Sequence, residues 1–183
     1  MLSGHIALIR WARPPARRRA PIGLAAGLGL ALIAAPALLH PSPRLIWNAS
    51  ASAPIGLYAL HPHARVSVGD MVVARTPASV RQLAALRHYL PADVPLVKRV
   101  AAAEGETVCA IGPTITVDGR WAANRRAADR LGRRLPWWAG CRSLTGGMVF
   151  LLMADAPDSF DSRYFGPVAA SAILGRATPL WLR

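Results

Sequence analysis

An uncharged run, residues 20–39, constrains the fold of this chain more than any other feature. As an α-helix the run would be about 30 Å long, which matches the hydrocarbon thickness of a bilayer. No polar face can be drawn through it, so a buried helix of a soluble domain fits less well. We therefore predict a transmembrane anchor helix over residues 20–39.

The tail before this run, residues 1–19, contains five arginines and no acidic residue. The positive-inside rule places such a tail in the cytoplasm, with residues 40–183 on the periplasmic side of a bacterial inner membrane. A cleavable signal peptide is the alternative, because residues 35–37 have the small-x-small form of a cleavage site, but the run is longer than a usual signal core. We predict a basic cytoplasmic tail, a single-pass anchor and one periplasmic domain.

The net charge of +13 raises the question of nucleic-acid binding. Five of these charges lie in the tail, and the remainder are scattered, with only a loose cluster over residues 120–142. Basic and aromatic residues do not alternate as they do in surfaces that stack bases. Anionic membrane lipid is therefore the expected partner, and no nucleic acid is expected.

Short apolar segments separated by turn signals predict a mainly β domain with an open, barrel-like sheet. Helical spacing over residues 79–90 puts Leu83, Leu86 and Leu90 on one side of a helix. The basic, Trp-rich stretch 120–142 is irregular and predicts a small inserted lobe over about residues 118–145. The expected strands are residues 57–60, 65–75 with a break at Gly69-Asp70, 96–102, 114–117 before an Asp118-Gly119 hairpin turn, 148–153 and 173–182.

The two cysteines, Cys109 and Cys141, would lie in an oxidising compartment if the anchor is correct. A disulfide is then expected, and it would contribute on the order of 3–4 kcal/mol by closing the loop between them. Two buried free thiols are the alternative. A zinc site is not expected, because the cysteines have no nearby histidine partners.

Candidate catalytic residues begin with two serines, Ser50 and Ser52, which precede a Pro54-x-Gly56 turn. A serine needs a base within hydrogen-bond reach to act as a nucleophile. Residues 40–51 reach at most about 40 Å when extended, so the serines would work close to the outer membrane face.

The candidate base is Lys98, the only lysine among 22 basic residues. Arginine is not deprotonated in proteins, whereas burial lowers the pKa of a lysine toward neutrality. The neighbours Leu96, Val97 and Val100 make this burial plausible. A lysine retained by chance in an arginine-biased chain is the alternative.

Four stretches of the chain form an ordered set of motifs. They are Asn48-x-Ser50-x-Ser52-x-Pro54-x-Gly56-Leu57-Tyr58, Gly69-Asp70-x-Val72, Lys98-Arg99-Val100 with Gly105-Glu106, and residues 158–168 (DSFDSRYFGPV). In this order they resemble the Ser, Gly-Asp, Lys-Arg and Asp-Ser-Arg boxes of the type I signal peptidase family. The serine box, the cysteine pair and the Phe-Gly-Pro ending resemble its conjugative-transfer (TraF-type) branch. The chain departs from the family at Ala53, where methionine is common, and at Glu106, where the second Gly-Asp becomes Gly-Glu.

The resemblance implies a role for each matching residue. Ser52 is the expected nucleophile, with Ser50 as the alternative, and Lys98 is the expected general base. Ser159 is expected to hold the lysine amine, and the Ser52 backbone N–H with the Ser50 hydroxyl is expected to bind the oxyanion. Asp161 and Arg163 are expected to form a structural ion pair, and no metal or organic cofactor is expected.

The implied function is removal of signal peptides from exported precursors, with a pilin or another conjugative-transfer subunit as substrate. Two alternatives stay open. One is a general type I signal peptidase, and the other is a non-catalytic, membrane-anchored subunit of a transfer or secretion apparatus.

Overall fold

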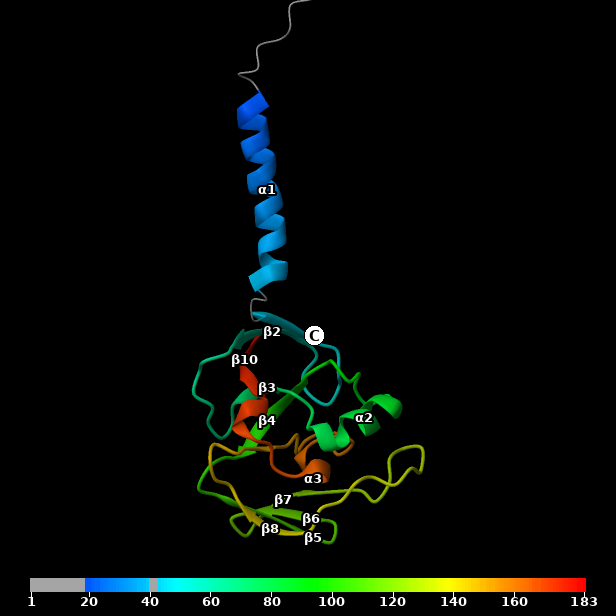
Figure 1. The fold of residues 1–183 in the computed structure, drawn as a ribbon. Helices are drawn as coiled ribbons and strands as arrows, with labels where there is room; N and C mark the ends of the chain where they lie inside the picture. Colours follow the sequence, from blue (N-terminus) through cyan, green and yellow to red (C-terminus); the bar gives the residue numbers. More distant parts are fainter. Residues whose placement is uncertain (1–18, 40–42) are drawn as a thin grey trace, which may run out of the picture. The chain divides into compact units, whose positions relative to one another are not determined.

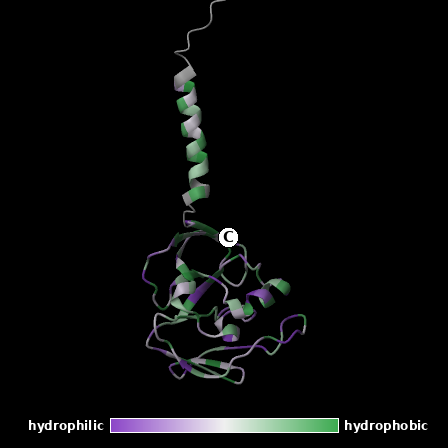
Figure 2. Ribbon diagram, viewed as in Figure 1, coloured by the Kyte–Doolittle hydropathy of each residue, from purple (hydrophilic) through white to green (hydrophobic). Residues whose placement is uncertain are grey.

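The computed structural model describes residues 19–39 and 43–183, in two units, Met1–Ser42 and Pro43–Arg183. In the first unit, the alanine- and leucine-rich helix α1 (Arg19–Leu39) is hydrophobic along most of its length (Figure 2). Within the described residues, however, no helix combines the length and hydropathy needed to cross a membrane. The anchor over residues 20–39 stays a prediction, and residues 1–18 and 40–42 lie outside the described residues.

The second unit is mainly β, as predicted, and is built on a six-stranded antiparallel sheet (Figure 1). The strand order β1-β2-β10-β3-β4-β9 leaves β1 and β9 at its two edges, so the sheet is open. Its strands are β1 (Leu45–Asn48), β2 (Gly56–His61), β3 (Met71–Ala74), β4 (Leu96–Ala102), β9 (Phe150–Leu151) and β10 (Ile173–Leu182).

A second, four-stranded antiparallel sheet has the order β7-β6-β5-β8. The Asp118-Gly119 turn between two of its strands has positive φ at both residues (46° and 75°), as the predicted hairpin requires. Its strands are β5 (Thr107–Ile111), β6 (Thr114–Val117), β7 (Arg120–Asn124) and β8 (Gly140–Ser143).

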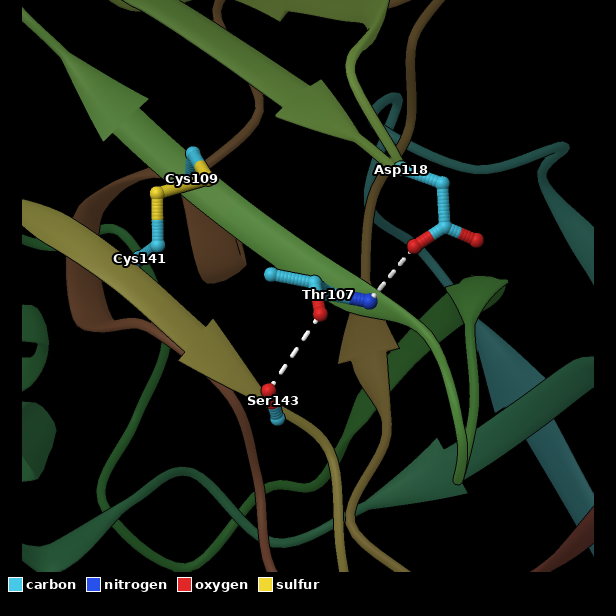
Figure 3. The surroundings of a disulfide bond; sticks show 5 residues. All are labelled: Thr107, Cys109, Asp118, Cys141 and Ser143. Atoms are coloured by element: carbon cyan, nitrogen blue, oxygen red, sulfur yellow. Dashed lines mark hydrogen bonds between the residues drawn. A yellow bond between two sulfur atoms is a disulfide. The ribbon is translucent and has the colours of Figure 1, made fainter.

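The predicted disulfide is present in this sheet (Figure 3). Cys109 of β5 lies directly opposite Cys141 of β8 in the strand register. Thr107 is the first residue of β5. Its backbone N–H donates to an Asp118 carboxylate oxygen at 2.8 Å, and the Thr107 hydroxyl oxygen lies 3.3 Å from the Ser143 hydroxyl oxygen. The covalent bond and these contacts fix the ends of the lobe to one another.

The second sheet extends from Thr107 to Ser143, whereas the predicted lobe covers about residues 118–145, and the bounds of that lobe stay a prediction. Within the stretch 120–142, which looks irregular in sequence, the strands β7 and β8 form at the two ends. All four residues of β8 are exposed, so this strand has no apolar pattern to find. Its place is fixed by backbone pairing and by the disulfide, which a periodicity argument does not detect.

Helix α2 (Ala78–Leu86) is shorter than predicted and buries a different side. Val80 and Ala84 are buried, whereas Leu86 is 73% exposed. The helix ends in a Schellman motif: His88 has a φ of 57° and donates to the Ala85 carbonyl, while Tyr89 donates to that of Ala84. This helix end turns the chain, so residues 89–90 no longer follow the helix axis.

Two other predicted strands are shorter in the structure. Only β3 forms within residues 65–75, because a turn precedes it, with Gly69 at a φ of 94°. Only β9 forms within residues 148–153. Two short helices, α3 (Ser162–Phe165) and η2 (Ala170–Ala172), complete the unit.

The core consists of three buried clusters, one of which underlies the serine-bearing loop between β1 and β2. It brings Tyr58 and Leu60 of β2 against Val97 of β4, so two distant segments of the sequence pack together. The apolar surroundings of β4 that the sequence predicts are therefore present. The other members of this cluster are Ala53, Val73, Met153 and Ala177.

Candidate active site

The loop between β1 and β2 is shaped by the buried side chain of Asn48. Its Nδ2 lies 3.0–3.1 Å from the carbonyl oxygens of Ser50, Ala53 and Pro54, and its Oδ1 accepts from the Ser50 backbone N–H at 3.1 Å. The Tyr58 hydroxyl donates to the Pro54 carbonyl at 2.7 Å. These bonds fold the loop around one amide, a role for Asn48 that the sequence motif alone did not assign.

Gly56 is needed where this loop enters β2. Its φ is 154°, and a Cβ built on it would lie 2.1 Å from the Trp181 carbonyl oxygen of β10. Only glycine permits this close approach of two backbones. The glycine of the serine box therefore has a packing reason, independent of chemistry.

Lys98 lies on β4 with 3% of its surface exposed. Its Nζ is 2.6 Å from the Ser52 Oγ and 2.9 Å from the Oγ of Ser159, which is itself buried. Residues separated by 46 and 61 positions in sequence thus meet at one amine. The structure brings together the three residues that the motifs predicted.

Burial lowers the pKa of Lys98 from 10.5 to about 8. The nearby Asp161 carboxylate opposes this shift, and the Arg163 guanidinium adds to it. At pH 7 roughly a tenth of the amine would be neutral, against well under a thousandth for an ordinary lysine. A neutral amine in contact with a hydroxyl can accept its proton.

The two serines of the loop are in contact through their hydroxyls. The Ser50 Oγ lies 2.8 Å from the Ser52 Oγ, and the Ser52 backbone N–H points toward the Ser50 Oγ at 3.4 Å. Ser52 is the serine that contacts Lys98, so the geometry favours it over Ser50 as nucleophile. The Ser50 hydroxyl and the Ser52 N–H are close enough to serve one oxygen atom together.

The loop that carries Ser159 is held by a buried ion pair between Asp161 and Arg163. The Arg163 Nε is 2.8 Å from Asp161 Oδ1, and its Nη2 donates to the carbonyls of Met153 and Ala156 at 2.7 and 3.1 Å. The Ser159 backbone N–H also donates to the Ala156 carbonyl. The pair therefore joins the Ser159 loop to the chain that follows β9.

A cavity of about 750 Å³ opens beside these residues. Ser52 and Lys98 line it, and its wall includes residues 87–90 after α2, residues from the 126–135 loop and residues 155–160. The Tyr89 hydroxyl donates to the Asp129 carboxylate, which also pairs with Arg133 at 2.7 Å. Sequence reasoning missed the first two segments of this wall, because they are irregular and distant in sequence.

Metal coordination is a separate question. Within residues 19–39 and 43–183, no cluster of three or more histidine, cysteine, aspartate or glutamate side chains is arranged to hold a metal ion.

Comparison with known proteins shows a family for this chain. The family model for signal peptidase, peptidase S26, matches residues 19–182. The chain belongs to the peptidase S26 signal peptidase family.

Curated relatives of this chain include two transfer proteins. The chain is 35% identical over 142 residues to the probable conjugal transfer protein TraF of Sinorhizobium fredii, covering 71% of this chain and 73% of that protein. It is 34% identical over 167 residues to a plasmid transfer protein TraF of Escherichia coli, covering 86% and 93%. A crystal structure of a signal peptidase I from Enterococcus faecalis aligns at a TM-score of 0.36 and 20% identity, over 63% of this chain and 98% of that one.

Two departures from the S26 signal peptidase motifs have structural explanations. Ala53, which follows Ser52, is 4% exposed and packs into the core cluster beneath the loop. Glu106 accepts from the Ala103 backbone N–H at 2.8 Å, so its carboxylate closes the turn between β4 and β5. Neither change touches the contacts of Lys98.

Proposed function

We propose that this chain is a membrane-anchored serine endopeptidase that removes signal peptides from exported precursors through a Ser52/Lys98 dyad. The observation that carries the proposal is the position of a single buried amine of lowered pKa between the hydroxyls of Ser52 and Ser159. Membership of the S26 family supports peptide hydrolysis as the reaction.

In the proposed reaction, the Ser52 Oγ attacks the scissile carbonyl carbon as neutral Lys98 takes the hydroxyl proton. The resulting lysine ammonium gives this proton to the leaving amine when the C–N bond breaks, and an acyl-enzyme ester remains. A water molecule then attacks the ester, again losing a proton to Lys98, and the Ser52 oxygen leaves and regains that proton. Ser159 would keep the amine in the same orientation throughout.

The oxyanion of each tetrahedral intermediate needs donors that are in place beforehand. We assign this role to the Ser52 backbone N–H and the Ser50 hydroxyl, which already lie beside each other. An incoming oxyanion would replace the weak 3.4 Å contact between them. Asn48 holds the loop in the required shape.

The proposed location is the bacterial inner membrane, with a cytoplasmic N-terminus, residues 20–39 as the anchor and the peptidase domain in the periplasm. The Cys109–Cys141 disulfide fits an oxidising compartment.

Exposed apolar side chains also gather where β1 and the end of β10 flank β2, and the ring centroids of Trp47 and Trp181 lie 5.7 Å apart. Such a patch suits a protein that works at a lipid surface. Its members are Leu45, Trp47, Leu180, Trp181 and Leu182.

The proposed substrate is the precursor of a pilin or of another conjugative-transfer subunit, because the curated relatives are named as transfer proteins. We expect membranes containing the full chain to shorten such a precursor at one site, while a bulk secretory precursor is cut at least about tenfold more slowly. Mass spectrometry of the products measures both the site and the relative rates.

Equal processing of both precursors would indicate a general signal peptidase. No processing of either precursor would contradict the peptidase proposal and favour a non-catalytic subunit of the transfer apparatus.

A further inference from the structure

Four arginines and three aspartates line the cavity beside the dyad, and they are not paired evenly. Arg133 pairs with Asp129, and the Arg87 Nη1 donates to the uncharged carbonyl of Arg134 at 2.7 Å. The other two arginines, Arg126 and Arg130, share a single carboxylate. At this one carboxylate, two positive charges therefore lie against one negative charge.

The shared carboxylate belongs to Asp158. The Arg126 Nη1 lies 2.7 Å from its Oδ1, and the Arg130 Nε donates to its Oδ2 at 2.9 Å. The side chains of Arg126 and Arg130 are nevertheless 51% and 78% exposed, so part of each guanidinium fork faces solvent. One aspartate balances only one of the two cations, and a second carboxylate would complete the arrangement.

Arg126 and Arg130 lie near the proposed dyad because of their contact with Asp158. Asp158 immediately precedes Ser159, whose hydroxyl is 2.9 Å from the Lys98 Nζ. An extended peptide advances about 3.3–3.6 Å per residue, so a side chain bound by the two arginines would lie only a few residues from the scissile bond. Arginine binds carboxylates through paired N–H groups, which gives the contact directional selectivity.

We propose that Arg126 and Arg130 form a substrate subsite that binds an acidic side chain near the cleaved bond. This inference rests on the proposed peptidase function and adds a determinant of its specificity. It selects precursors that carry glutamate or aspartate within a few residues of the cut.

The test uses short peptides with alanine before the intended cut and one glutamate moved from position to position, each compared with its glutamine counterpart. At one position, the full chain in detergent should cleave the glutamate peptide about 10- to 100-fold better in kcat/KM. Replacing both arginines (Arg126→Gln with Arg130→Gln) should bring this ratio close to one while cleavage of the glutamine peptide is retained.

Three further variants sharpen the test. Arg120→Gln removes an exposed arginine of β7 outside the cavity lining, so the glutamate preference should be unchanged. Asp155→Asn removes a negative charge from the lining, so the preference should stay equal or increase. Arg130→Glu should shift the preference toward a lysine at the same position.

A wild-type protein without a glutamate preference at any position, or a double variant that retains it, would overturn the subsite. Binding of the same peptides to the Ser52→Ala protein separates this failure from a failure of the peptidase proposal. Glutamate-selective binding that depends on the two arginines, without cleavage by the wild-type chain, leaves the subsite standing and contradicts the peptidase. Cleavage without a glutamate preference leaves the peptidase proposal standing and contradicts the subsite. The absence of both selective binding and cleavage contradicts both proposals.

Discussion

Ser52→Ala and Lys98→Met should each lower kcat/KM for precursor cleavage by at least about a thousandfold, since each removes one member of the proposed dyad, whose two members act as a unit. Ser50→Ala should lower kcat/KM by less, about 100-fold, because it removes one of the two proposed oxyanion donors while the Ser52 N–H remains. Quantitative processing assays on purified full-length variants measure these rates. A variant of Ser52 or Lys98 that retains half of the wild-type rate would contradict the dyad.

The same Lys98→Met variant should be more stable than the wild type below pH 8, by up to about 3 kcal/mol. A pKa lowered from 10.5 to about 8 means that folding disfavours the charged amine, and each unit corresponds to about 1.36 kcal/mol. The penalty is fully present below pH 8 and decreases as the pH rises toward 10.5, where the unfolded chain also loses its proton. Urea unfolding of both proteins at pH 7 measures this difference, and it shows that lost activity is not lost folding.

Removing Arg163 should have the largest effect on stability. Arg163→Met leaves the Asp161 carboxylate, which is 0% exposed, without its cation, and it also deprives the carbonyls of Met153 and Ala156 of their donor. Breaking a buried ion pair from one side costs about 3–5 kcal/mol, against a typical total of 5–15 kcal/mol for a domain. We expect a correspondingly lower free energy of unfolding and poor accumulation of the protein.

The controls for this prediction separate charge from packing. Arg120→Met, on an exposed part of β7, should change stability by less than about 0.5 kcal/mol. Asp161→Asn combined with Arg163→Met should recover part of the loss, because no uncompensated charge remains buried. A wild-type unfolding free energy for Arg163→Met alone would show that the pair does not hold the Ser159 loop.

The central residues of the site were predictable because chemistry restricts them strongly. Only one side chain among 22 basic residues can act as a base, and the apolar segment around it predicts its burial. The strands β2, β4, β6 and β10 also follow from apolar or turn patterns in their own segments. For these elements, local sequence and tertiary environment agree.

The strand β8, the end of α2 and the arginines of the cavity wall were not predictable from local pattern. β8 is exposed along its whole length and is placed by pairing with β5, while α2 stops early because His88 adopts a left-handed conformation. Arg126 and Arg130 were visible only as part of a loose basic cluster. Their shared contact with Asp158 spans about 30 residues of sequence, and only the folded chain brings these residues together.

The proposed mechanism requires that burial lowers the pKa of Lys98 to about 8, so that a usable fraction of its amine is neutral near physiological pH. Lys98 is the only lysine of the chain, so ¹⁵N labelling of lysine Nζ gives a side-chain signal from this residue alone in an NMR titration. We predict a midpoint of about 8, with kcat/KM rising over the same pH range. A midpoint near 10.5, the value of an ordinary solvated lysine, would contradict the mechanism.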